Sequence, residues 1–145
     1  MSDFLKVVFI VFLILVIQSC TDLGSTTSKY RIINDTPHTV ELRFYKASIA
    51  SQERKFVLKV EIEGEGLVLE RTLKTYPPET NKPTDAYEAD SVAVIFNKER
   101  VEGHKLFVPD GNSILFDYEI NGSQYTYTIT DENYNNATPC DGPCY

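Results

Sequence analysis

The sequence has little basic character and few of the residues that usually carry chemistry. It contains 14 Lys and Arg against 21 Asp and Glu, a net charge of −7, so it is a poor partner for nucleic acid, which needs a basic face. It has no tryptophan, two histidines and three cysteines, and its single methionine is the first residue. The longest apolar run, residues 7–17, has about 11 residues, whereas a membrane-spanning helix needs about 20. A transmembrane protein and a nucleic-acid-binding protein are therefore disfavoured.

The first twenty residues have the pattern of an export signal. Lys6 precedes the short apolar run, and the small residue Ser19 follows it. The pair Ser19-Cys20 resembles the end of the lipobox in bacterial lipoprotein signals, with Ile17, Gln18 and Ser19 in the three positions before the cysteine. The resemblance implies that residues 1–19 are a signal peptide and that Cys20 becomes the acylated first residue of the mature chain. An uncleaved anchor helix over the same run is the alternative.

Residues 20–29 predict a lipidated cysteine followed by a short flexible tether, because the segment is small and polar in composition. The nine residues from Thr21 to Lys29 reach at most about 30 Å when extended, so the folded part must work close to a membrane. Thr21 stands where lipoproteins retained at the inner membrane of enteric bacteria carry aspartate. This favours the outer membrane, with the protein facing the periplasm or the cell surface.

The remaining residues, 30–145, predict a single all-β domain. Alternation of polar and apolar residues predicts strands with turn signals between them. We expect an antiparallel β-sandwich, with an immunoglobulin-like layout as one arrangement and a small barrel as the alternative. The predicted strands cover residues 38–46, 55–63, 67–74, 91–96, 105–108, 114–120 and 124–130.

Several local features make this prediction specific. The apolar residues expected to face inward on the first two strands are Val40, Leu42, Phe44, Phe56, Leu58, Val60 and Ile62. Residues 64–66 are expected to turn the second strand back onto the third, and residues 91–96, apolar on both faces, predict a central strand. Asn121-Gly122 predicts a type I′ hairpin turn, and Thr130 a cap for a short helix. The prolines within residues 76–85 indicate a loop.

A second resemblance covers most of the mature chain. Its motifs are the segments YRIINDT at residues 30–36, DSVAVIF at 90–96, YTYTIT at 125–130 and CDGPCY at 140–145. They resemble a group of small lipoproteins from Bacteroidota that carry no assigned activity. The resemblance implies a β-rich domain at the cell envelope. It implies no catalytic residue and no cofactor.

Cys140 and Cys144 are a pair in a chain expected to be exported to an oxidising compartment, so they predict a small disulfide loop at the C-terminus. A thiol redox role is the first alternative, although the spacing differs from the C-x-x-C of oxidoreductases. A zinc site is the second. It would need two further ligands, and the only histidines are His38 and His104, which we expect to be solvent-facing loop residues.

Three weaker candidates complete the set. The carboxylates Glu61, Glu63, Glu65 and Glu70 surround one predicted turn, and we interpret them as a solvated face rather than a calcium site or an acid/base pair. Ser91 lies in the tripeptide Asp90-Ser91-Val92, which resembles an O-glycosylation motif of some Bacteroidota, although a covered strand would hide it. The Tyr and Phe residues of the last hairpin predict core packing, with a ligand platform as the alternative.

The expected function is that of a cell-envelope lipoprotein whose domain binds or supports another component without catalysis. The expected partners are the membrane, through the lipid on Cys20, and an envelope protein or glycan. A small envelope hydrolase or thiol redox enzyme is the alternative. A protease-inhibitor-like module that presents residues 76–86 is another.

Overall fold

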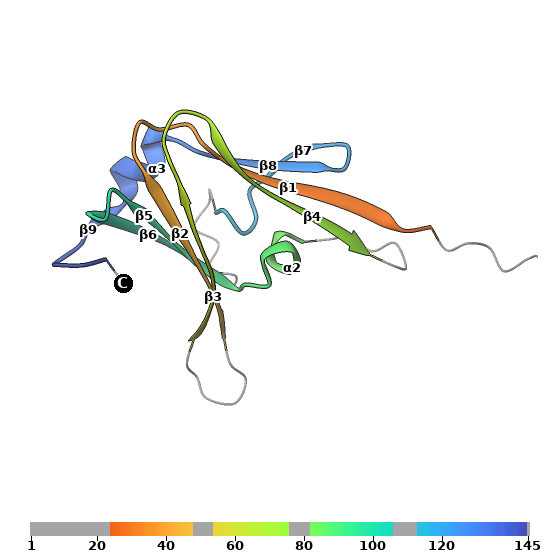
Figure 1. The fold of residues 1–145 in the computed structure, drawn as a ribbon, viewed down its shortest axis with the longest axis horizontal. Helices are drawn as coiled ribbons and strands as arrows, with labels where there is room; N and C mark the ends of the chain where they lie inside the picture. Colours follow the sequence, from red (N-terminus) through yellow and green to blue (C-terminus); the bar gives the residue numbers. More distant parts are fainter. Residues whose placement is uncertain (1–23, 48–53, 76–81, 106–112, 145) are drawn as a thin grey trace, which may run out of the picture.

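The computed structural model describes residues 24–47, 54–75, 82–105 and 113–144. These residues form nine strands in two sheets together with two short helices (Figure 1). No helix in these four segments is long and apolar enough to cross a membrane. The predicted signal peptide and Cys20 lie outside the described residues, as do residues 76–81 of the predicted loop.

The first sheet has four strands in the order β4-β1-β8-β7. Strand β1 (Thr26–Asn34) lies between β4 (Leu67–Thr75), which is antiparallel to it, and β8 (Gln124–Ile129), which is parallel. Strand β7 (Glu119–Asn121) forms a hairpin with β8. The parallel pair makes the prediction of a purely antiparallel sandwich wrong. Parallel neighbours need a long connection, and nearly the whole domain lies between β1 and β8.

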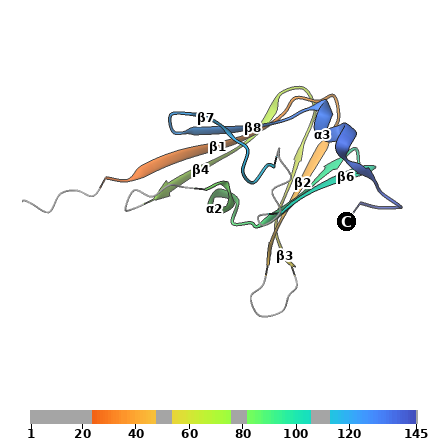
Figure 2. The ribbon, with the colours of Figure 1, turned by 180° about the vertical axis from the view of Figure 1, so that it is seen from behind.

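The second sheet has five antiparallel strands in the order β3-β2-β5-β6-β9. Their bounds are β2 (Val40–Ala47), β3 (Arg54–Ile62), β5 (Ser91–Phe96), β6 (Arg100–Lys105) and β9 (Thr138–Pro139). The strands of this sheet run in a different direction from those of the first, as both views show (Figures 1 and 2). Strands β1 and β2 lie in different sheets, whereas the first two strands of a constant-type immunoglobulin domain pair within one.

The core lies between the two sheets, and its residues follow the predicted alternation. On β2 the side chains of Val40, Leu42 and Phe44 are completely buried. The central strand β5 is covered on both faces, as its sequence predicted, because Val94 and Ile95 point in opposite directions and both are buried. The buried hydrophobic cluster comprises Tyr30, Ile32, Val40, Leu42, Phe44, Ile62, Tyr87, Ala89, Val92, Val94, Phe96, Ile114, Leu115, Tyr118, Tyr127, Ile129 and Ala137.

Strands β3 and β4 do not form the predicted hairpin. Residues 64–66 instead carry the chain from one sheet to the other, because β4 pairs with β1 and β3 pairs with β2. Gly64 is required there, since a Cβ atom would lie 2.7 Å from the carbonyl oxygen of Thr36. The prediction that Phe56 faces inward is also wrong. The register shifts between Phe44 and Tyr45, and Phe56 beyond the shift is 51% exposed.

The strand that contains Lys105 begins earlier in the chain than predicted, and the strand predicted at residues 114–120 is shorter than predicted. Strand β6 ends at Lys105 and begins five residues earlier, and residues 106–108 lie outside the described part of the chain. Residues 114–116 form a turn that places Ile114 and Leu115 in the core. Only residues 119 and 120 of the predicted segment 114–120 lie in a strand, β7. The apolar residues before them, Ile114 and Leu115, are buried without pairing in a sheet.

The β7–β8 turn is shifted by one residue from the prediction. Asn121 pairs with Gln124, so the two central residues are Gly122 and Ser123. Gly122 has a φ of 60°, and glycine at the first central position is typical of a type II′ turn rather than type I′. The helix predicted after Thr130 is present as α3 (Asp131–Asn136), with Thr130 as its N-cap. The second helix, α2 (Pro83–Tyr87), occupies the end of the predicted loop.

Asn34 ties together the turns that link the two sheets. Its side-chain nitrogen donates to the carbonyl oxygens of His38 at 2.8 Å, Glu63 at 3.1 Å and Ile62 at 3.3 Å. Its side-chain oxygen accepts from the hydroxyl of Thr36 at 2.8 Å and from the Thr36 backbone at 3.2 Å. One completely buried amide therefore joins the β1–β2 connection to the β3–β4 connection.

Candidate functional site

The five-stranded sheet has one face toward the core and one face away from it, which we call the outer face. Cross-strand partners share a face, so the register assigns its residues. Glu41, Arg43 and Tyr45 of β2 lie opposite Ile95, Ala93 and Ser91 of β5, and these in turn lie opposite Val101, Gly103 and Lys105 of β6. At one end of the outer face the C-terminal segment covers part of the surface beside a recess of about 260 Å³, and a second open recess lies at the other end.

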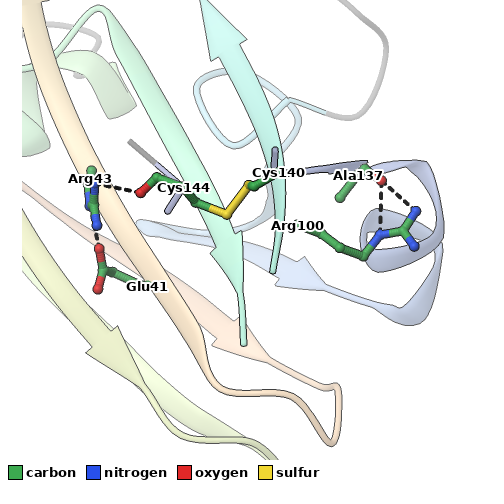
Figure 3. The surroundings of a disulfide bond; sticks show 6 residues. All are labelled: Glu41, Arg43, Arg100, Ala137, Cys140 and Cys144. Carbon is green, nitrogen blue, oxygen red and sulfur yellow. Dashed lines mark hydrogen bonds and ion pairs between the residues drawn. A yellow bond between two sulfur atoms is a disulfide. The ribbon is translucent and has the colours of Figure 1, made fainter. Parts of the chain in front are cut away.

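The C-terminal segment, residues 138–144, covers one end of the outer face; we call it the C-terminal strap. The predicted disulfide between Cys140 and Cys144 closes this strap, with the two Cα atoms 5.4 Å apart (Figure 3). The backbone N–H of Cys140 donates to the carbonyl oxygen of Glu99 at 2.8 Å. An Arg43 guanidinium nitrogen donates to the carbonyl oxygen of Cys144 at 3.1 Å. The disulfide therefore fixes a short tail against the sheet.

A second arginine anchors the start of the strap. Both Nε and Nη2 of Arg100 donate to the carbonyl oxygen of Ala137, at 3.0 Å and 2.6 Å (Figure 3). The guanidinium of Arg100 also lies 5.2 Å from the ring centre of Tyr134 on α3. These contacts, together with the pairing of β6 with β9, hold the end of the chain to the edge of the sheet.

The covered region contains a buried carboxylate. Glu41 is 3% exposed although it lies on the face away from the core. Its two oxygens form ion pairs with Nε of Arg43 and, at 2.6 Å, with Nζ of Lys59 on β3. Burial alone would raise the pKa of Glu41, but the hydrogen bonds from Lys59 and Arg43 outweigh it and hold the pKa below its ordinary value. Glu41 is therefore ionised at neutral pH.

Glu41→Gln is expected to destabilise the protein by about 2 kcal/mol at pH 7, because it removes the charge from two hydrogen-bonded ion pairs. The folded pKa of Glu41 lies below the unfolded value, so its contribution is present above about pH 5 and is lost as the pH falls through the folded pKa. Urea unfolding of both proteins from pH 7 to pH 3 checks this. The difference should shrink toward low pH, and the same change at the exposed Glu119 on β7 of the other sheet should have little effect at any pH.

The open recess lies at the other end of the outer face and has a volume of about 320 Å³. Its lining residues are Tyr45, Arg54, Ser91, Val92, Ala93, Gly103, His104 and Lys105. The small residues Ala93 and Gly103 are cross-strand partners in the middle of the sheet, and they form its floor. Tyr45 packs edge-on against Phe56, with ring centres 5.9 Å apart, and forms one wall. Concave sites of about 300 Å³ and more are the usual size of small-ligand pockets.

The two histidines lie in different environments, because His38 is partly exposed and His104 is buried. His38 is partly exposed, and its ring stacks on Tyr134 with centres 3.8 Å apart. His104 was predicted to face solvent, which is wrong: it lies on β6, on the side toward the core, and is 3% exposed. Its Nε2 lies 3.3 Å from a carboxylate oxygen of Glu102. The segment around His104 is polar in sequence, so its assignment to a strand with one buried face was missed.

Glu102 belongs to a buried polar cluster beneath α3. The side-chain amide of Asn133 donates to Glu102 and to the hydroxyl of Tyr127, both at 3.1 Å. Asn133 also caps the start of α3 by accepting from the backbone N–H of Thr130 at 3.0 Å. The cluster therefore fastens the helix to β6 and β8, which is a structural role.

The buried tyrosines have pKa values raised above their ordinary value, and burial is the main cause. The pKa of Tyr30 is raised to about 12, and those of Tyr87, Tyr118 and Tyr127 are raised further. Tyr30 stacks on Tyr125 at 4.8 Å and meets Tyr118 edge-on at 5.9 Å. The aromatic residues of the last hairpin therefore belong mainly to the core. This confirms the prediction of core packing. Phe116 is the exposed exception.

The remaining candidates are dispersed. Glu61, Glu63, Glu65 and Glu70 are all exposed. Glu70 forms an ion pair with Lys29 of β1 at 2.8 Å, so it belongs to the four-stranded sheet rather than to a shared carboxylate site. In the four described segments no three His, Cys, Asp or Glu side chains are placed together to hold a metal ion.

Ser91, the candidate for O-glycosylation, is 3% exposed, and its hydroxyl donates to Asp90 at 3.2 Å. Its small exposed fraction gives a modifying enzyme little access to the hydroxyl. The lipidation site Cys20 lies outside the described residues. The chain matches no family model, no curated protein and no solved structure.

Proposed function

We propose that the protein is a lipoprotein of the cell envelope, held at a membrane by lipid on Cys20, and that its β-sandwich is a binding module without catalytic activity. The outer membrane is the favoured location, with the domain facing the periplasm or the cell surface. The outer face of the five-stranded sheet is the proposed binding surface.

The observation that carries the proposal is where the folded domain begins. Strand β1 starts at Thr26, so only five residues separate it from Cys20. The last part of the predicted tether, residues 26–29, lies in the strand, and Ser28 is already buried. Six Cα–Cα steps span at most about 21 Å, so the start of β1 would lie within that distance of an acylated Cys20. A domain joined so closely to the cysteine fits a membrane-bound role.

The shape of the molecule supports binding at the distal sheet. The start of β1 and the β7–β8 turn lie at one end of the long axis, and β9 and the C-terminal strap lie at the other (Figures 1 and 2). With the lipid at the β1 end, the five-stranded sheet points away from the membrane. Its outer face is then available to a component of the envelope.

The resolved pKa shifts give no support to acid–base catalysis by Glu41 or by the buried tyrosines. A general acid or base is most effective when its pKa lies near the working pH. Here the resolved shifts move away from neutrality, because the pKa of Glu41 is lowered and the pKa values of the buried tyrosines are raised. The Glu41 ion pairs fix the sheet surface and leave no proton to exchange at neutral pH.

Fractionation of cells that express the full chain tests the anchor. The wild type is expected in the membrane fraction, resistant to extraction by high salt and released by detergent, since acyl chains rather than charge hold it. Cys20→Ser should lose this attachment. Cys140→Ser is the matched control, because it removes a cysteine of the strap and should leave the protein in the membrane fraction. Equal membrane association of Cys20→Ser and wild type would contradict the proposal.

A further inference from the structure

The recess on the outer face depends on a glycine that the fold does not require. Glycine in the middle of a strand weakens it, and such a residue often marks a place where a ligand or another backbone approaches closely. Gly103 lies in the middle of β6, its φ is outside the left-handed region, and no described atom lies within 4 Å of the Cβ position. Gly64 is the contrast, since a Cβ atom there would collide with the neighbouring turn. The space above Gly103 is thus available to a bound group.

Cations gather around this space in an otherwise acidic protein. Arg54 and Lys105 line the recess, and neither forms an ion pair within the described segments. The nearby carboxylate of Asp90 is already engaged, because it accepts from the backbone N–H of Ala47 at 2.6 Å and from the Ser91 hydroxyl. The recess can therefore compensate a negative charge on a ligand.

The walls and floor of the recess indicate what kind of uncharged group would fit beside the anionic group of a ligand. Tyr45 offers an aromatic wall, and Ala93 and Gly103 offer a flat floor of small residues. A puckered saccharide ring has C–H groups on its faces that pack against such surfaces, and a negative group at its edge can reach the two cations. The volume of about 320 Å³ suits one or two small rings rather than a protein segment.

We propose that the recess over Gly103 binds an acidic sugar, a saccharide ring that carries a carboxylate or a phosphate. The inference deepens the proposed binding role of the outer face and rests on it, but it does not depend on the lipid. Tyr45 packs against the ring, Ala93 and Gly103 leave it room, and Arg54 and Lys105 bind the anionic group. A salt-sensitive affinity follows, because the two cations are exposed.

Isothermal titration calorimetry of the full chain in detergent micelles tests the proposal with three probes: trigalacturonate, glucose 6-phosphate and the neutral galactotriose. At least one anionic probe should bind, and galactotriose should bind at least about tenfold more weakly. Gly103→Val should abolish binding of the anionic probe by filling the recess, while its unfolding midpoint in urea stays the same or rises. Arg54→Gln with Lys105→Gln should weaken binding at least about tenfold and reduce its dependence on salt.

The matched control is Arg71→Gln with Lys74→Gln on β4, which changes the net charge equally on the other sheet and should leave binding unchanged. Binding that survives in a folded Gly103→Val protein overturns the proposal, as does the absence of binding by both anionic probes. Equal weakening by the β4 control also overturns it, because the effect would then come from net charge. None of these outcomes bears on the proposed lipid anchor. If the protein binds the sugar but does not attach to the membrane, only the proposed location is overturned.

Discussion

Replacing Asn34 with alanine is expected to lower the free energy of unfolding by about 3 kcal/mol or more. The change removes one amide that serves three carbonyl oxygens and both polar groups of Thr36. A buried polar group left without a partner costs about 1–3 kcal/mol, and several are affected at once. Urea unfolding monitored by circular dichroism measures the loss. Asn136→Ala, at an exposed position on α3, is the control and should change stability little.

Asn34→Asp sharpens this test, because it keeps the shape of the side chain and removes only its donor. At neutral pH the new carboxylate would face three carbonyl oxygens, so its pKa in the folded state should be raised. The protonated form is then the one the fold tolerates, and the destabilisation should grow as the pH rises from 4 to 7. A loss below about 1 kcal/mol for Asn34→Ala, or no pH dependence for Asn34→Asp, would contradict the role given to this residue.

Phe44→Ala is expected to cost about 3–5 kcal/mol, the usual loss for a large aromatic residue removed from a core. Phe44 is completely buried, and its ring stacks on Tyr87 of α2 with centres 4.8 Å apart. The substitution therefore leaves a cavity and also loosens the helix. Equilibrium unfolding in urea measures the difference from wild type.

Phe56→Ala provides the matched control, because it makes the same chemical change on the neighbouring strand. Phe56 is 51% exposed and touches Tyr45 at the surface, so its loss should cost less than about 1 kcal/mol. Similar losses for the two variants would mean that the register shift between Phe44 and Tyr45 does not turn Phe56 outward. The pair thus tests the local register as well as the core.

The strand pattern was predictable wherever one side of a strand is buried and the other is not. The alternation in β2 identified Val40, Leu42 and Phe44, and the continuous apolar run in β5 identified a central strand. The same signal overassigned residues 114–118, because Ile114 and Leu115 enter the core from a turn. The spacing of apolar residues indicates which side chains are buried. It does not indicate which backbone groups form hydrogen bonds between strands.

Pairing between distant strands was not predictable from local pattern. Residues 64–66 have the composition of a hairpin turn, yet the flanking strands belong to different sheets, and Asn34 fixes that arrangement from thirty residues away in sequence. The parallel pairing of β1 with β8 likewise depends on the whole domain. Asn-Gly was correctly assigned to a turn, but the pairing of Asn121 with Gln124 set its position.

The candidate site was only partly visible in the sequence. The disulfide between Cys140 and Cys144 was expected, but nothing local shows that the strap folds over β2 and contacts Arg43. Glu41 occupies a polar position in an alternating strand, so its burial had no local signal. Gly103 did carry a signal, because glycine is unusual inside a strand, although the strand itself was placed too late in the chain.

Mass spectrometry of the N-terminal peptide from the purified mature protein tests the central claim most directly. The account predicts that the chain begins at Cys20 and carries a diacylglyceryl group on its sulfur, with a further acyl chain on its amine. A free thiol at Cys20, or a peptide that still contains residues 1–19, would contradict the proposed anchor and with it the location of the binding module.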